Sequence, residues 1–325
     1  MSSNLQNQNR VRVAIVTGAA QGIGRAIALR LAADGLDVAV NDIERQKGAL
    51  EQLVSVIQAL GRQAIAVPGD VTSEQAVESM VGSTVQKLGR LDVMVANAGV
   101  AHPGTIVDMS LQNWKNLNAV NVEGVMLCYK YAARQMIKQG EGGRIIGASS
   151  ICGKKGVATL GAYCASKFAV RGLTQTAALE LSEYNISVNA YAPGMIHTSM
   201  TTAQKDSGWA SLRKIAGAPQ AKTGYPDDIA QWVSFIASPG SHFMTGQTTI
   251  IDGGSKVLVF RSEAEEHNTE TTAPASLTIS VRSPYISTIS YASIITESRF
   301  TLSACPLRPW HGCTSLTEPT HSRAA

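Results

Sequence analysis

The chain has 325 residues, with 28 Lys or Arg against 24 Asp or Glu and five cysteines. So few cysteines, and an odd number of them, exclude a disulfide-based scaffold, and the scattered basic residues form no stripe of the kind that binds nucleic acid. The sequence contains neither an N-terminal apolar segment nor an apolar run of about 18 residues, so we expect no secretory signal, no membrane span and a cytoplasmic location.

Glycine is distributed unevenly along the chain. Positions 1–260 hold 28 of the 29 Gly, whereas 261–325 hold one Gly, 21 Ser or Thr and five Pro. The last stretch has too little apolar material for a second core, which favours disorder. We therefore predict a polar arm (1–10), one globular domain (11–258) and a disordered, Ser/Thr-rich tail (259–325). A regulatory extension or an interaction module is the alternative interpretation of the tail.

Strand and helix patterns alternate through the globular part. Helical periodicity fills the spaces between short apolar runs, as at 44–60, where Leu50, Leu53 and Ile57 share one face. The runs predict seven strands: Arg12–Thr17, Asp37–Asn41, Ala64–Val67, Val93–Ala96, Arg144–Ser149, Ser187–Ala190 and Thr248–Ile251. Strands that are apolar on both faces and alternate with helices predict a doubly wound, Rossmann-like α/β fold with a parallel sheet of about seven strands.

A glycine-rich turn follows the first strand. It reads Thr17-Gly18-Ala19-Ala20-Gln21-Gly22-Ile23-Gly24. Its glycines allow a tight turn close to a pyrophosphate, and the helix that follows offers free N–H groups, so the pattern predicts a dinucleotide site. A tight turn without a ligand is the alternative.

Asp42 lies at the end of the second strand, 18 residues beyond Gly24. A carboxylate there can accept hydrogen bonds from the adenosine ribose hydroxyls and would repel a 2′-phosphate. The residue therefore predicts NAD as the cofactor. Arg45 and Lys47 are close enough to keep NADP as the less favoured alternative, and a solvated loop carboxylate is the other interpretation of Asp42.

A second motif, Tyr163-Cys164-Ala165-Ser166-Lys167, lies on a predicted helix, and its spacing puts Tyr163 and Lys167 on one helix face. Ser150 precedes Tyr163 by 13 residues. Together with the glycine-rich turn, this pattern resembles the short-chain dehydrogenase/reductase family over residues 11–254. Further segments resemble the family in the same order: Asn97-Ala98-Gly99, Val120-Asn121-Val122-Glu123-Gly124, Pro193-Gly194, Thr198, Thr245-Gly246-Gln247 and Ile251-Asp252-Gly253-Gly254.

The resemblance implies a catalytic set of Asn121, Ser150, Tyr163 and Lys167. Tyr163 would be the general acid/base, and Lys167, with the positive nicotinamide, would lower the pKa of its phenol. Ser150 would polarise the substrate oxygen, and Asn121 would hold a water that relays protons to Lys167. The cofactor contacts that the resemblance implies are Thr17, Gly18, Gln21, Gly22, Ile23, Gly24, Asp42, Asp70, Val71, Asn97, Gly99, Tyr163, Lys167, Pro193, Gly194, Ile196 and Thr198. Helix capping is the alternative role for Asp70.

Within the family, Lys167–Ala178 and Met244–Gln247 are locally most similar to NAD-dependent diacetyl/acetoin reductases, also called butanediol dehydrogenases. The resemblance implies hydride transfer between NAD and a secondary alcohol or ketone of that kind. Ile151 and Val157 stand where that group tends to place polar amides, and they favour the alternative of a bulkier apolar alcohol in secondary metabolism.

A catalytically silent dinucleotide-binding protein is a competing class, which predicts loss of one of the four catalytic residues; all four are present. The resemblance also implies a homo-dimer or homo-tetramer. We expect a small-molecule substrate, and neither a metal site, a nucleic acid nor a membrane as partner.

Overall fold

The structure is a computed structural model that describes residues 10–202 and 222–254. The tail predicted at 259–325 and nearly all of the predicted polar arm lie outside the described residues. Seven parallel strands form one sheet in the order β3-β2-β1-β4-β5-β6-β7. Their bounds are β1 Val13–Val16, β2 Asp37–Val40, β3 Ala64–Ala66, β4 Val93–Ala96, β5 Gly143–Ala148, β6 Ile186–Pro193 and β7 Thr248–Ile251. The doubly wound, Rossmann-like prediction is confirmed.

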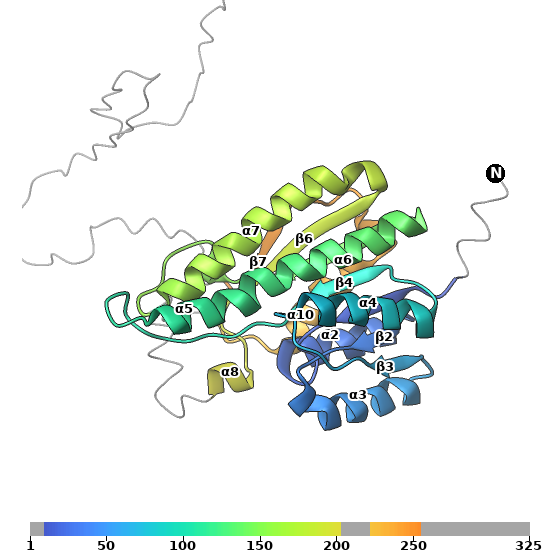
Figure 1. Cartoon of the computed structure of the whole chain (residues 1–325), viewed down its shortest axis with the longest axis horizontal. Coiled ribbons are helices and arrows are strands. Elements are labelled where there is room, and N and C mark those ends of the chain that lie inside the picture. The colour runs from blue at the N-terminus through green and yellow to red at the C-terminus, as the bar shows by residue number, and fades with distance from the viewer. Residues whose placement is uncertain (1–9, 203–221, 255–325) are drawn as a thin grey trace, which may run out of the picture. The chain divides into compact units, whose positions relative to one another are not determined.

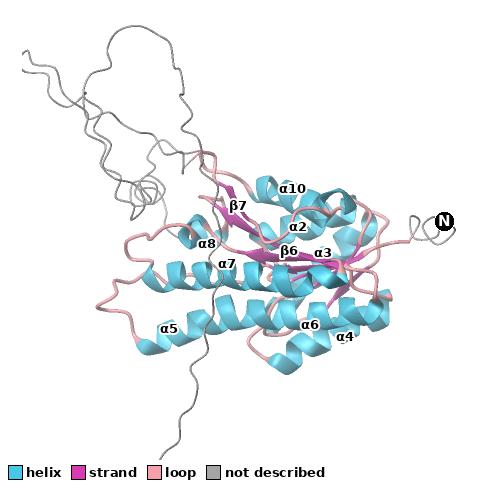
Figure 2. Cartoon of the chain, turned by 90° about the horizontal axis from the view of Figure 1, so that it is seen from above, coloured by secondary structure: helices cyan, strands magenta, loops and turns pink. Residues whose placement is uncertain are grey.

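Helices cover both faces of the sheet, which lies between two helical layers in Figure 2. On one face, α2 (Gly22–Ala33), α3 (Lys47–Ala59) and α10 (Pro226–Ala237) bury an apolar cluster with the strands. On the other face lie α4 (Glu74–Leu88), α6 (Gly124–Gln139) and α7 (Gly161–Leu181), which share a second cluster (Figure 1). Two short helices, α5 (Leu111–Asn118) and α8 (Ser199–Thr202), lie near the carboxyl ends of the strands.

Local sequence signals set the helix ends. The Ser73 hydroxyl accepts a hydrogen bond from the Ala76 amide at the start of α4, and Gly89 ends that helix with a φ of +92°. Pro226 opens α10, where its missing N–H costs nothing. The helix predicted at 44–60 is a 3-10 turn, Glu44–Gln46, followed by α3. None of the helices that the structure describes is both long and apolar enough to span a bilayer.

A single π-helical segment, Ala119–Glu123, joins α5 to α6. The wider π turn accommodates one extra residue, and such turns are frequent at functional sites. Asn121 lies in this segment and is completely buried. The sequence pattern gave no signal for the π turn, because hydrophobic periodicity does not distinguish it from an α-helix with one phase error.

The chain reverses its winding direction at β1. It proceeds outward through β2 and β3, then returns to place β4 on the other side of β1. In open α/β sheets, ligands bind in the crevice that such a reversal leaves at the carboxyl ends of the strands. The fold therefore places its candidate site where the loops after β1 and β4 separate.

Candidate active site

A cleft of about 680 Å³ opens at the carboxyl ends of the strands. Its volume lies in the range of small-molecule sites. The predicted site residues that line it are Gly18, Gln21, Gly22, Ile23, Gly24, Asp42, Asp70, Val71, Asn97, Gly99, Ser150, Tyr163, Lys167, Pro193, Gly194, Ile196 and Thr198. Two further predicted residues, Thr17 and Asn121, are fully buried and do not line it.

The glycine-rich turn is closed so tightly that only glycine fits at its centre. A Cβ on Gly24 would lie 2.2 Å from the Gly18 carbonyl oxygen, and Gly18 itself has a φ of +64°. The Asn97 amide donates to the carbonyl oxygens of Thr17 (2.8 Å) and Gly18 (3.2 Å). These contacts fasten the turn to the loop after β4, so the approach to the helix α2 amino end is fixed before any ligand arrives.

Two buried side chains support this turn from behind. The Thr17 hydroxyl accepts hydrogen bonds from the backbone amides of Asn97 and Ala98, both at 3.0 Å. The Tyr191 hydroxyl, on β6, donates to the Asn97 Oδ1 at 2.7 Å. Thr17 thus builds the turn rather than lining the cleft, and Tyr191 is a supporting residue that sequence reasoning missed. Its hydrophobic strand context gave no sign of a polar role.

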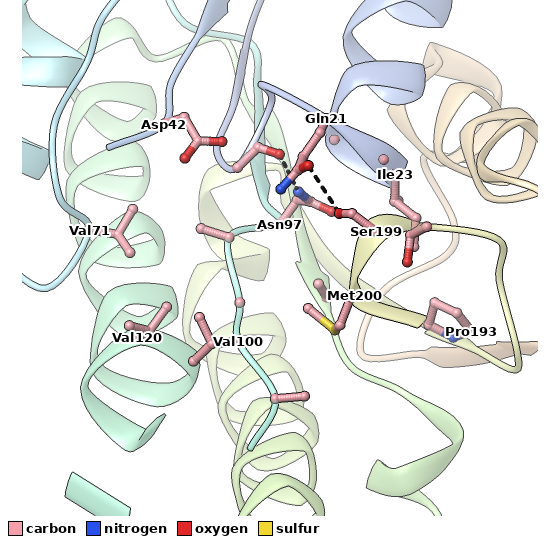
Figure 3. Close-up of a pocket in the computed structure, with 18 of the residues that line it drawn as sticks. Gln21, Ile23, Asp42, Val71, Asn97, Val100, Val120, Pro193, Ser199 and Met200 are labelled. Carbon is pink, nitrogen blue, oxygen red and sulfur yellow. Dashed lines mark hydrogen bonds between the residues drawn. The ribbon is translucent and has the colours of Figure 1, made fainter. Parts of the chain in front are cut away.

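The end of β2 presents a fixed carboxylate to the cleft. Asp42 accepts hydrogen bonds from the backbone amides of Ala20 (3.1 Å) and Ile43 (2.9 Å), which hold it beside the glycine-rich turn. Figure 3 shows Asp42 facing the same cavity as Asn97 and Gln21. An acceptor in this place suits a ribose diol and opposes an additional phosphate.

The neighbouring wall is formed by the loop after β3. The Asn41 amide donates to the carbonyl oxygens of Val67 (2.8 Å) and Gly69 (3.0 Å), which holds this loop against the cleft. The Asp70 carboxylate accepts a hydrogen bond from Thr72, whereas Ser73 caps α4. The alternative role of Asp70 as a helix cap is therefore wrong.

Ser150, Tyr163 and Lys167 meet at the other end of the cleft. Ser150 begins a 3-10 turn, in which its hydroxyl accepts from the Cys152 amide at 3.1 Å, and it lies close to the Tyr163 hydroxyl. The Lys167 ammonium lies 5.5 Å from the centroid of the Tyr163 ring and donates to the Ala148 carbonyl at 2.9 Å. The structure therefore confirms that Tyr163 and Lys167 lie on one face of α7.

Burial dominates the electrostatics of this group. It raises the pKa of the Tyr163 phenol above its ordinary value, with a further rise from the Cys152 thiol and an opposing effect of the Ser150 hydrogen bond. Burial also lowers the pKa of the Lys167 ammonium to about 8. The lowering of the Tyr163 pKa by Lys167 together with a positive nicotinamide stays a prediction for the cofactor-bound protein.

The Asn121 side chain makes its hydrogen bonds to other groups of the protein. Its Oδ1 accepts from the Val100 amide at 2.8 Å, and its Nδ2 donates to the Val100 carbonyl (2.9 Å) and to the Ser166 hydroxyl (3.1 Å). Both amide hydrogens are therefore used, so the side chain has no donor left for a relay water. The hydroxyl of Ser149, the neighbour of Ser150 directly after the end of β5, donates to the Lys167 carbonyl at 3.0 Å.

The apolar part of the cleft differs from the sequence expectation. Ile151 and Val157 do not line it; they pack with Cys152 and Cys164 in a small apolar cluster that includes Tyr163. Apolar residues from other segments line the cleft instead: Ala101 in the loop after β4, and Val100, Val120 and Met200, which Figure 3 labels.

The Ser199 hydroxyl, at the start of α8, donates to the Gln21 side chain at 3.0 Å, which joins α8 to the glycine-rich turn. Neither Ser199 nor Met200 was singled out from the sequence. Within the described residues, no group of three His, Cys, Asp or Glu side chains lies close enough to hold a metal ion.

Comparison with known proteins agrees with this geometry. A family model described as enoyl-(acyl carrier protein) reductase matches residues 18–256. The chain is 50% identical over 244 residues to the short-chain dehydrogenase/reductase eriH of Hericium erinaceus (74% of this chain, 96% of the relative). It is 40% identical over 256 residues to L-2,3-butanediol dehydrogenase of Corynebacterium glutamicum (75% and 98%).

Among solved structures, acetoin dehydrogenase from Enterobacter cloacae superimposes with a TM-score of 0.68 at 37% identity, over 76% of this chain and 96% of that one. The family model covers the glycine-rich turn from Gly18 onward, the Ser150 loop and the Tyr163–Lys167 helix face. The chain therefore belongs to the short-chain dehydrogenase/reductase family and is an oxidoreductase of the kind that acts on CH–OH groups.

Proposed function

We propose that the protein is an NAD-dependent oxidoreductase that interconverts a secondary alcohol and a ketone. The observation that carries the proposal is the grouping of Ser150, Tyr163 and Lys167 in the same cleft as the Asp42 carboxylate. Ser150, Tyr163 and Lys167 suit a substrate oxygen that gains or loses a proton. The Asp42 carboxylate suits the ribose of a nicotinamide cofactor without a 2′-phosphate.

The cleft fits such a cofactor. Gly18 and Gly24 allow the turn to close tightly and line the cleft, and the amino end of α2 adjoins them, where a pyrophosphate would be held. Asp42 would hold the adenosine ribose, with Asp70 near the adenine. The remaining proposed contacts are Gln21, Gly22, Ile23, Val71, Asn97, Gly99, Tyr163, Lys167, Pro193, Gly194, Ile196 and Thr198, while Thr17 acts through the turn. When bound, the nicotinamide supplies the hydride acceptor or donor.

The chain's own residues account for the proton. The raised pKa of Tyr163 keeps its phenol protonated at neutral pH, so its hydroxyl can donate a proton to a carbonyl oxygen that is being reduced. Ser150 would donate a hydrogen bond to that oxygen and stabilise its developing negative charge. Lys167 remains largely protonated at pH 7, so its charge favours the tyrosinate that proton donation leaves behind. Oxidation of an alcohol would need the tyrosinate first and is expected to speed up as pH rises.

For the substrate we propose a small hydroxyketone or diol, resembling acetoin or butanediol. Relatives named L-2,3-butanediol dehydrogenase and acetoin dehydrogenase support this choice. The second candidate is a bulkier apolar alcohol of the kind found in secondary metabolism. The apolar cleft wall of Val100, Ala101, Val120 and Met200 favours it, because polar substrate oxygens would find no partner there.

Two measurements test the proposal. Titration with NADH and NADPH, followed by protein fluorescence, should give tighter binding of NADH; tighter NADPH would contradict the reading of Asp42. Turnover of diacetyl, acetoin and a cyclic ketone should then fall by at least a hundredfold in Tyr163→Phe. Tyr184→Phe, at a half-exposed tyrosine beyond α7, is the matched control and should retain full turnover. Full turnover in Tyr163→Phe would refute the proposed chemistry.

We further propose that residues 11–258 fold as one unit, that this unit forms a homo-dimer or homo-tetramer and that it works in the cytoplasm. Light scattering of the full chain and of a variant lacking 259–325 tests assembly. A monomer in both would contradict the oligomer.

A further inference from the structure

Ser166 precedes Lys167 in α7, and neither its sequence position nor its size assigned it a role. The structure buries it completely. Its hydroxyl donates to the Tyr163 carbonyl at 2.8 Å and accepts from the Asn121 Nδ2 at 3.1 Å. One hydroxyl thus uses both of its hydrogen-bonding capacities to join the active-site turn of α7 to the π segment between α5 and α6.

Asn121 passes this connection on to the cleft. Its amide group pairs with both the N–H and the C=O of Val100, at 2.8 and 2.9 Å, and Val100 lines the cleft in the loop after β4. A Cβ on Gly99 would lie 3.3 Å from the Asn121 Oδ1 and 3.3 Å from the Lys167 Nζ. The chain of contacts from Ser166 therefore ends at the backbone that faces Lys167.

The same helix contains a useful comparison. Thr174 is also completely buried, its hydroxyl donates to the Val170 carbonyl at 2.8 Å, and it shares a 2.9 Å hydrogen bond with the Tyr129 hydroxyl. Its local pattern matches that of Ser166: one bond back along the helix and one bond to another side chain. The Tyr129 pair, however, does not line the cleft, so Thr174 shows what a purely structural hydroxyl in α7 contributes.

We propose that Ser166 is a positioning residue for the reaction, whose hydroxyl orients the Asn121 amide and through it holds the Val100 backbone against the Tyr163–Lys167 pair. The inference rests on the proposed function, because the Tyr163–Lys167 pair needs a fixed position only if it takes part in the reaction. Without the hydroxyl, one buried hydrogen of the Asn121 amide loses its acceptor, and an unpaired buried donor is costly enough to favour rotation of the amide. Rotation would break both bonds to Val100.

The test compares Ser166→Ala with Thr174→Val in the full chain. Hydrogen exchange of the Val100 backbone amide, measured by NMR without cofactor, reports directly on its hydrogen bond to the Asn121 Oδ1. We expect exchange to speed up at least tenfold in Ser166→Ala and to stay unchanged in Thr174→Val, although both lower the unfolding temperature. We also expect kcat to fall about tenfold in Ser166→Ala with little change in the KM for NADH, and to stay within twofold in Thr174→Val.

Unchanged Val100 exchange in Ser166→Ala would overturn the proposal, as would equal losses of kcat in the two variants. A failure of the proposed function gives a different pattern. In that case Tyr163→Phe would keep the wild-type turnover, while the exchange measurement would still decide whether Ser166 holds Val100.

Discussion

The buried charge of Lys167 should lower the free energy of unfolding of the protein. The residue is 3% exposed, and burial lowers the pKa of its ammonium from 10.5 to about 8. A displacement of that size means that folding disfavours the charged form relative to the uncharged form by about 3 kcal/mol more than in the unfolded chain. Lys167→Met removes the charge but keeps the length and the apolar stem. It also gives up the hydrogen bond to the Ala148 carbonyl, worth about 1–2 kcal/mol. We therefore expect an inactive protein whose free energy of unfolding at pH 7 is about 1–2 kcal/mol higher.

The pH dependence gives this prediction its sharpest check. Below about pH 8, lysine is protonated in both the folded and the unfolded chain, so the wild type carries the full cost. Between about 8 and the unfolded value of 10.5, the unfolded chain binds the proton and the folded chain does not, so wild-type stability gains with pH. Urea unfolding of both proteins at pH 7 and pH 10 should show the stability gap narrowing. A gap that does not change with pH, or a less stable Lys167→Met at pH 7, would refute the reasoning.

Three further changes test other parts of the site. Gly24→Ala sets a Cβ 2.2 Å from the Gly18 carbonyl oxygen, so NADH binding should be lost in a fluorescence titration; a normal affinity would contradict the closed turn. Tyr191→Phe removes the 2.7 Å bond to Asn97, so the KM for NADH should rise severalfold with kcat within twofold, and an unaltered KM would argue against a supporting role. Ser73→Ala removes the cap of α4, so thermal unfolding should show about 1 kcal/mol less stability at unchanged turnover, and a change in turnover would link this helix end to the site.

Sequence patterns predicted those features of the site that depend on local spacing. The separation of Tyr163 and Lys167 fixes a shared helix face, and glycines between a strand and a helix fix a turn, so both follow from the chain alone. Interactions between distant segments were out of reach. The hydrogen bond from Tyr191 to Asn97 joins residues 94 positions apart. The Ser166 hydroxyl accepts its hydrogen bond from Asn121, 45 positions earlier in the chain.

The effect of burial on the pKa of Tyr163 was out of reach for a related reason. Adjacent charge is visible in sequence as the following lysine, whereas burial depends on everything that packs around the phenol. The apolar cleft wall was also misassigned, because Ile151 and Val157 pack with Cys152 and Cys164 and do not line the cavity. Proximity in sequence to Ser150 was a poor guide to proximity in space.

The π segment at Ala119–Glu123 makes the length of this helical connection as critical as its composition. The wider π turn already absorbs one extra residue, so deleting one residue there would let α5 and α6 continue as a regular helix with Tyr129 and Met136 still facing the core. An inserted residue cannot be absorbed in this way, because each residue in an α-helix turns the chain by about 100° and every side chain beyond the insertion would face a new direction relative to the sheet. The connection should therefore keep its fold after the loss of one residue and lose it after the gain of one, an asymmetry that a scan of deletions and insertions across residues 115–127 would display directly.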